Sequence, residues 1–386
     1  MITINQKFKS EQEYTFSISQ VPEISTDTAY IYSIQDTNNN LTARKINNTV
    51  FGLTYSGSSE TFTSNIQLVI NGVSGYDNGL TVNFTVNGTL AKEPVRIYNT
   101  SNYTVSVDIY RNSSSAPTLD IYYCVGSREG SYTHYTNSTD SGYNPIKSIS
   151  VGPNQSVWIY SDTMTRWSNS NYEYDYIRIG TPNYSGVKLE LSGNIMSLVT
   201  GNDFQFAKLF QNFQTLSSVS NNFLPATTLT TACYRYMFNG CSSLTTAPNL
   251  PATTLAYNCY ADMFRSCTAL TTAPTILPAT TLAEGCYSNM FYICRALTTA
   301  PELPATTLVS NCYYHMLYGC SSLNYIKALF TTTPSDSYTN LWVNGVASTG
   351  TFVKNHNATW DVTGTNAIPS GWTVITDTYN DDNGME

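Results

Sequence analysis

The sequence predicts a mixed fold, in which two N-terminal all-β sandwich domains precede a short solenoid of stacked repeats with a cap at each end. Two observations indicate this order. Short runs of alternating apolar and polar residues fill the first half of the chain, and one block of sequence then recurs four times with its cysteines in register. The predicted domains are residues 1–92, 93–191, 192–330 and 331–386.

The first predicted sandwich covers residues 1–92. Runs such as YTFSISQV, IQLVINGV and LTVNFTVNG alternate apolar and polar residues between clusters of Asn, Gly and Ser. Successive side chains of a strand point to opposite faces, so this period predicts an immunoglobulin-like β-sandwich. Residues 91–95, AKEPV, are interpreted as the linker that follows it.

The second predicted sandwich, residues 93–191, is rich in aromatic residues. Its strands are expected in VRIYNTSNYTVSVDIYRN, LDIYYCV, KSISVGPNQSVWIYS and YDYIRIGT, and it is expected to end near GVKLELSG. Aromatic side chains favour pleated surfaces and bring a large apolar area to them. The residues expected to supply it are Tyr110, Tyr122, Tyr123, Trp158 and Tyr160.

The repeats begin at Cys233, Cys259, Cys286 and Cys312, as in CYADMFRSCTALTTAPTILPATTL. Their steps are 26, 27 and 26 residues, and the longer step is explained by one extra residue at Ile276. A fixed period in this range is typical of a solenoid, whose units stack because none can bury its apolar face alone.

Each repeat is expected to hold a helix followed by a short strand. Leu255, Cys259, Met263, Cys267 and Leu270 are spaced by four, four, four and three residues, which predicts one apolar helical face. The segment LTTAP reads as a strand that the prolines end, because proline donates no backbone hydrogen bond.

Both ends of the solenoid need a cap, because an open end exposes core. Residues AKLFQNFQTLSSV align with part of a repeat and place Phe213 where Cys241 stands in the next one, as a cap would. After the last repeat, Trp342, Trp360 and Trp372 are expected to cover it. There SDSYTNLW predicts a capped helical turn, and GTFVKN and GWTVI predict strands.

These repeats resemble the BspA-like leucine-rich-repeat surface proteins of gut Bacteroidetes and of their phages. The strings CYSNMF, LTTAPELPATTL, SGNIMSLVTGNDF before the repeats and the tail LNYIKALFTTTPSDSYTNLW carry the resemblance. It implies a leucine-rich-repeat solenoid used for binding or display, and it brings no catalytic residue. Residues 1–92 have no counterpart in it, so they are the candidate anchor to a particle or a partner.

Composition limits the classes of partner. Charged residues are 11% of the chain, against about 25% in an average soluble protein, and the net charge is -8. A chain this acidic offers phosphates no electrostatic footprint, so nucleic acid is not expected as a partner. No run of about 18 apolar residues occurs, which excludes a helical membrane span, and MITINQKFKS is not expected to be a signal peptide.

Eight of the cysteines lie in the repeats, and they are interpreted as a structural ladder of reduced, buried thiols. Disulfides between equivalent positions of neighbouring repeats stay open as an alternative. Zinc is disfavoured, because its structural sites pair cysteines two to four residues apart. The ladder residues are Cys233, Cys241, Cys259, Cys267, Cys286, Cys294, Cys312 and Cys320.

No motif indicates catalysis, a cofactor or a metal site. His134, His315 and His356 each stand without a nucleophile or a carboxylate nearby in the sequence, and a lone histidine is more often a surface or packing residue. Paired carboxylates for glycoside hydrolysis stay open, because residues distant in sequence can meet in space.

The variable positions of the repeats form the candidate ligand or partner surface. They are expected to point into solvent, where tyrosines on a rigid scaffold give contact area at low entropic cost. An ordinary solvated side of a solenoid explains them equally well. The residues are Arg235, Tyr236, Asp262, Arg265, Tyr292, Arg295, Tyr314, His315 and Tyr318.

The resulting hypothesis is a non-enzymatic structural or adhesion component of a bacteriophage virion, such as a head fibre, capsid decoration or tail fibre. Residues 1–92 would bind other virion proteins, and the repeats would bind host-surface or mucosal glycan or protein from the virion surface. A homo-oligomer is expected. The alternatives are a secreted bacterial cell-surface adhesin of the BspA type and an enzyme of polysaccharide breakdown.

Overall fold

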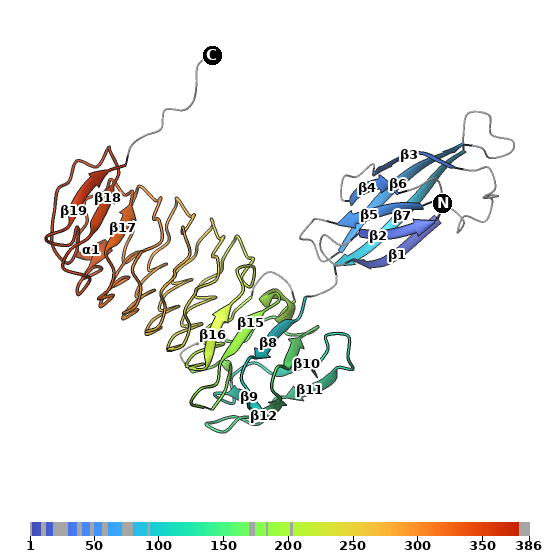
Figure 1. Ribbon diagram of the computed structural model, residues 1–386, viewed down its shortest axis with the longest axis horizontal. Coiled ribbons are helices and arrows are strands. Elements are labelled where there is room, and N and C mark those ends of the chain that lie inside the picture. Colours follow the sequence, from blue (N-terminus) through green and yellow to red (C-terminus); the bar gives the residue numbers. More distant parts are fainter. Residues whose placement is uncertain are drawn as a thin grey trace, which may run out of the picture. The chain divides into compact units, whose positions relative to one another are not determined.

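The computed structural model of the chain is shown in Figure 1. The residues that it describes are 2–8, 13–17, 30–36, 41–46, 50–55, 61–71, 80–90, 93–169, 174–182, 184–200 and 204–377. The chain is mostly β, with several antiparallel sheets and almost no helix. Its internal contacts divide it into two compact units, Met1–Glu93 and Pro94–Glu386, which are described separately.

The first unit holds two sheets, in the orders β1-β7-β6-β3 and β2-β5-β4. Strands β1 and β7 pair in parallel, and the other pairs are antiparallel. Buried side chains such as Phe51, Leu53, Ile66 and Leu68 form its core. The strands are β1 (Ile2–Phe8), β2 (Glu13–Ser17), β3 (Tyr30–Asp36), β4 (Leu41–Lys45), β5 (Val50–Tyr55), β6 (Thr61–Asn71) and β7 (Leu80–Leu90).

The second unit begins with a six-stranded sheet, β11-β10-β13-β8-β15-β16, and a three-stranded sheet, β12-β9-β14. Apolar residues alternate along these strands and fill the core, including Ile97, Val107, Ile121 and Ile159. The strands are β8 (Val95–Asn99), β9 (Val105–Arg111), β10 (Leu119–Val125), β11 (Thr133–Asn137), β12 (Lys147–Val151), β13 (Ser156–Tyr160), β14 (Ile177–Gly180), β15 (Leu189–Ser192) and β16 (Leu216–Val219).

The repeats continue this six-stranded sheet. Strand β16 pairs in parallel with β15, and parallel bridges then join Ser218 to Thr246 and Thr246 to Thr272. In Figure 1 the coils between β16 and β17 (Tyr325–Ala328) stack in one row. A second connection runs from β14, where the Ile179 amide donates to the Leu209 carbonyl at 2.7 Å. The predicted domain boundaries at 191/192 and 330/331 both fall inside this compact unit.

The predicted helix in each repeat is wrong, because the segment is a run of consecutive tight turns. In the first repeat, each turn is closed by a hydrogen bond from a backbone amide to the carbonyl three residues earlier, as from Met237 to Tyr234 at 3.2 Å. The alternate amides bond to the next repeat, as from Tyr234 to Cys259 at 3.0 Å and from Phe238 to Met263 at 2.9 Å. Along the turn run, backbone amides therefore alternate between bonds within a turn and bonds to the next repeat, so both sets of amides have partners.

The turn run has a period of four residues, which is why it imitates a helix. A left-handed φ recurs at every fourth residue, with 55° at Ala232, 58° at Tyr236 and 75° at Gly240. In a helix, a step of four residues overshoots one turn by about 40°. Side chains at repeated steps of four therefore drift around the helix and do not stay on one face. In the turn run, the backbone conformation itself repeats every four residues. Of the four side chains in each period, two point inward and two point outward.

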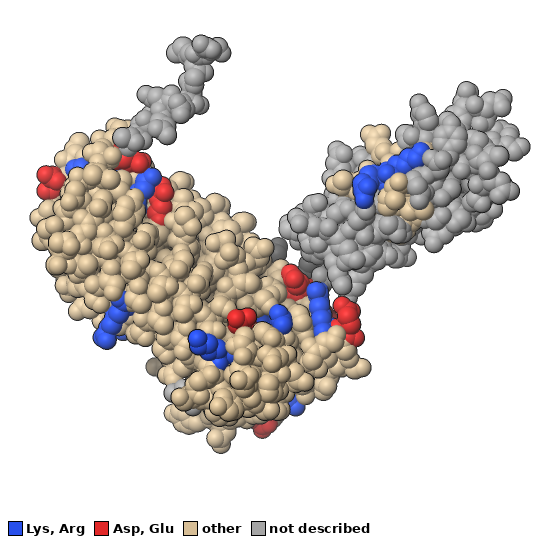
Figure 2. Space-filling model, in the orientation of Figure 1, with Lys and Arg blue, Asp and Glu red and all other residues tan. Residues whose placement is uncertain are grey.

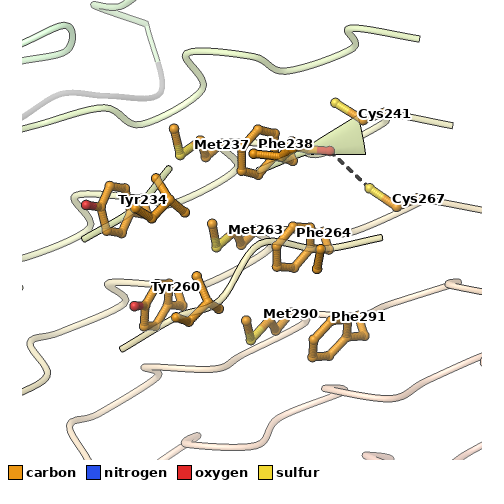
Figure 3. Close-up of a cluster of buried hydrophobic side chains, with 14 of the residues drawn as sticks. Tyr234, Met237, Phe238, Cys241, Tyr260, Met263, Phe264, Cys267, Met290 and Phe291 are labelled. Atoms are coloured by element: carbon orange, nitrogen blue, oxygen red, sulfur yellow. Dashed lines mark hydrogen bonds between the residues drawn. The ribbon is translucent and has the colours of Figure 1, made fainter. Parts of the chain in front are cut away.

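The inward side chains form ladders through the repeats (Figure 3). Ring centroids of Phe238, Phe264 and Phe291 follow one another at 5.6 Å, and Tyr234, Tyr260 and Tyr287 form a parallel row at 5.8 and 5.9 Å. All of these side chains are buried. Offset-stacked aromatic pairs contribute about 0.5–1.5 kcal/mol each beyond the burial of their area.

The two ends of the stack are closed by aromatic side chains. Phe206 stacks on Tyr234 at the first repeat, and at the last Trp342 stacks on Tyr313 with a centroid distance of 6.0 Å. The tryptophan indole nitrogen donates to the Ala367 carbonyl at 2.9 Å, so its polar atom is satisfied.

The segment after the last repeat contains the short helix and the strands predicted there. They are α1 (Asp336–Thr339), β18 (Thr351–Lys354) and β19 (Thr373–Thr376), and the two strands extend β17 in parallel. The predicted side-chain cap of the helix is wrong, because Ser335 makes no capping hydrogen bond with its side chain. Before the repeats, a short 3₁₀ helix spans Ile195–Leu198.

Replacing Gly193 by Ala should test the connection between β8 and β15. A Cβ at Gly193 would lie 2.0 Å from the Pro94 carbonyl oxygen, whereas one at Gly186, also at positive φ, meets nothing within 4 Å. Gly186→Ala should cost about 1–2 kcal/mol from φ strain alone, and Gly193→Ala about 1–3 kcal/mol more from overlap. Urea unfolding of both variants checks this, and equal costs would contradict the close approach.

Candidate binding face

The outward side chains of neighbouring turn runs lie side by side and form what we call the outer turn face. Eight of the nine candidate surface residues belong to it, and Lys208 joins it from the turn run before the first repeat. The outer turn face comprises Lys208, Arg235, Tyr236, Asp262, Arg265, Tyr292, Tyr314, His315 and Tyr318.

Asp262 organises the middle of this face. Its carboxylate lies 3.2 Å from Arg265 Nη1 and 3.8 Å from Arg235 Nε. The interpretation that Asp262 points into solvent is wrong, because the residue is only 3% exposed and the two arginines cover it. Burial raises the pKa of this carboxyl, although both arginines act to lower it.

Aromatic contacts extend the face toward the last repeats. The Arg265 guanidinium lies 4.4 Å from the centroid of the Tyr292 ring, and Tyr292 stacks on Tyr318 at 4.8 Å. His315 lies 3.9 Å from Tyr314 and 5.4 Å from Tyr318, and burial lowers its pKa. Because the pKa of His315 is lowered, its imidazole is neutral at neutral pH.

At the other end, Lys208 links the face to the sheet that precedes it. Its ammonium lies 5.3 Å from the Tyr236 ring and 4.8 Å from the ring of Tyr176, which comes just before β14. Sequence reasoning missed Lys208, although the alignment of AKLFQNFQTL with the repeats places it opposite Tyr236. Its conjunction with Tyr176 depends on tertiary packing alone.

Arg295 stands apart from the outer turn face. It follows Cys294, the last inward residue of its turn run, and its side chain is exposed. No ion pair or ring contact joins it to the other candidate residues within the described part of the chain. Figure 2 shows how sparsely charged side chains are spread over the visible surface of this unit. Ion pairs also join Lys327 to Glu302 and to Asp377, but among the ion pairs of the described residues the carboxylate of Asp262 is the most deeply buried.

His134 has a carboxylate partner that the sequence did not reveal. Its Nε2 lies 2.6 Å from Asp120 Oδ1 across the β10–β11 pair. The hydroxyl of Thr163 donates to the other oxygen of Asp120 at 2.5 Å, and this bond, followed by His134, lowers the carboxyl pKa. A nucleophilic triad needs the hydroxyl bonded to the histidine, so this arrangement lacks the required order.

The cysteine ladders are buried, and the structure records all nine cysteines as free. Cys267 Sγ donates to the Phe238 carbonyl of the preceding repeat at 3.1 Å (Figure 3). Cys294 and Cys320 make the equivalent bond. Burial raises the pKa of the Cys312 thiol to about 11 and that of Cys259 to about 12. Such thiols are protonated and unreactive near neutral pH.

Among the described residues no cluster of His, Cys, Asp and Glu can hold a metal ion, and no helix is long and apolar enough to cross a membrane. Comparison of the chain with protein-family models, with curated proteins and with solved structures gives no match. The assignment of the outer turn face as a candidate binding site therefore rests on its geometry, in which aromatic rings, arginines and a buried carboxylate are held by a hydrogen-bonded backbone.

Thiol titration should decide between free and bridged cysteines. In denaturant without reductant, a colorimetric thiol reagent should detect nine thiols per chain, and in the native state almost none at pH 8, because all nine thiols are buried. Each disulfide between repeats would lower the denatured count by two, which would contradict the reduced ladders.

Asp262→Asn should change how stability depends on pH. Because the folded pKa of Asp262 is raised above its unfolded value, the folded state binds the proton more tightly, and this contribution to stability is lost as pH rises through the folded pKa. Asp262→Asn should therefore gain stability relative to the parent chain from pH 3.5 upward. Urea unfolding at several pH values measures the difference, and a relative loss with rising pH would contradict burial as the dominant cause.

Proposed function

We propose that the chain is a non-enzymatic structural and adhesion component of a bacteriophage virion. In this proposal the two β units are immunoglobulin-like sandwiches, and the repeats form a BspA-like leucine-rich-repeat solenoid that displays the outer turn face. The bonding of each repeat to the next through the same alternate amides supports the solenoid assignment.

The observation that carries the binding role is the outer turn face. Its rings and guanidinium groups are already held by stacking and ion pairing, as in Arg265 over Tyr292. Side chains ordered before a ligand arrives lose little conformational entropy on binding. A face of this kind suits a host-surface or mucosal glycan or protein.

The placement on a virion rests on the resemblance of the repeats to a family shared by gut bacteria and their phages, and on the composition. Only 11% of the residues are charged, and the sequence is rich in Ser, Thr, Asn and Tyr, which carry hydroxyl and amide groups. Residues 1–92, which lie outside that resemblance, are proposed to bind other virion proteins. The bacterial branch of the family favours the second candidate, a secreted cell-surface adhesin.

Quantitative mass spectrometry of purified phage particles and of the bacterial outer surface separates the two candidates. A virion component should occur at a fixed copy number per particle, and a chain lacking residues 1–92 should fail to enter particles. A matched deletion of residues 378–386 is the control and should leave incorporation unchanged. Detection on cells alone would overturn the virion assignment and leave the adhesin.

A further inference from the structure

A cleft of about 320 Å³ lies where the three-stranded sheet β12-β9-β14 meets the first turn run. Tyr110 on β9, Tyr143 before β12, and Tyr176 and Arg178 at β14 line one part, and Gln211 and Asn212 of the turn run line another. All of these segments belong to the second compact unit. The cleft is thus built from two elements that the hydrogen bond between Ile179 and Leu209 holds together.

The cleft is continuous with the outer turn face. Tyr176 lines the cleft and also lies under the Lys208 ammonium, which in turn contacts Tyr236 of the first repeat. The backbone amide of Asn212 donates to the Asn239 carbonyl of that repeat at 2.7 Å. A chain-like ligand held in the cleft would therefore meet the repeats with its next units.

The charge of the cleft favours an anion. Its lining includes Arg178 but no Asp or Glu among the described residues, and the carboxylate of Asp108, which accepts from the hydroxyl of the lining residue Tyr110 at 3.3 Å, lies behind that lining and is only 4% exposed. The Arg178 guanidinium lies 4.2 Å from the centroid of Tyr110 and donates to the Gln211 carbonyl at 3.4 Å, which fixes its plane and leaves further N–H donors. A planar guanidinium matches the two oxygens of a carboxylate.

The remaining lining groups fit a sugar ring. Tyr143 is 100% exposed, so its ring is free to cover the apolar face of a saccharide. The Asn112 side-chain amide donates to the Tyr174 carbonyl at 2.9 Å, so its own oxygen can accept from a sugar hydroxyl. Aromatic rings beside a few polar groups are the usual make-up of a ligand pocket.

We propose that this cleft binds an acidic saccharide, with the sugar carboxylate on Arg178, a ring of the saccharide on Tyr143, and the following units along the outer turn face. This inference deepens the proposed binding function and rests on it, because it names the class of ligand. It does not depend on whether the chain is carried by a virion or by a cell.

The test uses the purified full chain on a glycan array of matched pairs, in which each acidic oligosaccharide is printed beside its neutral counterpart. The pairs are oligomers of glucuronic acid with oligomers of glucose, oligomers of galacturonic acid with oligomers of galactose, and sialyllactose with the same trisaccharide after reduction of its carboxyl group. Titration calorimetry then measures affinity for the best acidic member. The chain should prefer the acidic member of at least one pair by about tenfold or more, as expected for a charge-assisted hydrogen-bonded contact.

Two variants test the site, and a third is the control. Arg178→Gln should abolish the preference for the acidic member, and Tyr143→Ala should weaken binding about threefold to tenfold. Tyr103→Ala removes a 64% exposed tyrosine that lies before β9, outside both the cleft lining and the turn runs, and should leave affinity within about twofold. Because Tyr143 is wholly exposed, its variant should keep the parent circular-dichroism spectrum even if Arg178→Gln perturbs folding.

Binding to none of the acidic members, equal binding to both members of every pair, or binding that survives both cleft variants would each overturn the proposal. Capture of a host protein that neither variant weakens, without any glycan signal, would also overturn it and leave a protein-binding function. Absence of the chain from virions would refute the virion assignment but leave the array result standing, so the two failures are distinguishable.

Discussion

The second unit depends on one constraint in the backbone of each turn run. Successive amides alternate between a carbonyl of the same turn run and a carbonyl of the next repeat. One set closes turns, as from Met237 to Tyr234, and the other reaches the next repeat, as from Phe238 to Met263. Neither set satisfies the backbone alone, and an unpaired buried amide costs about 1–3 kcal/mol. A single repeat would leave half of its amides without partners, so the repeats are stable only as a stack.

The same constraint sets the side chains in register. Because each turn run bonds to the next through equivalent residues, like side chains must lie above like, which gives the rows of Phe, Tyr, Met and Cys (Figure 3). A small thiol at Cys267 fits where it also reaches a carbonyl of the preceding repeat. On the outer side the same register places Tyr292 against Tyr318, so the core and the candidate binding face share one geometric cause.

Much of this organisation could be predicted from the sequence. The repeats, the inward cysteines and the closing role of Trp342 follow from spacing and composition, and the short helix and the strands near the C-terminal end follow from local patterns. The predicted helix in each repeat was wrong because the apolar spacing was interpreted with the helical period of 3.6 residues. Leu255, Cys259, Met263 and Cys267 follow one another in steps of four without an intervening three, which indicates a backbone period of four.

The candidate site was less predictable. Repeat alignment identified the outward positions, but it could not show that Asp262 is covered by two arginines from different turn runs. Nor could it join Tyr176 to Lys208, or Asp120 to His134, because each pair is brought together by strand or layer contacts between segments distant in sequence. The cleft beside Arg178 depends on the same kind of packing.

The extra residue at Ile276 has a consequence for how such a chain can diversify. Ile276 is 41% exposed and lies on the proline-rich side of the coil, where it makes a parallel bridge with Glu302, while the turn runs before and after it keep their bonds. Length changes at this corner are therefore absorbed without shifting the outer turn face. Evolution or protein design could therefore insert loops at this corner and add a binding specificity while the outer turn face stays unchanged.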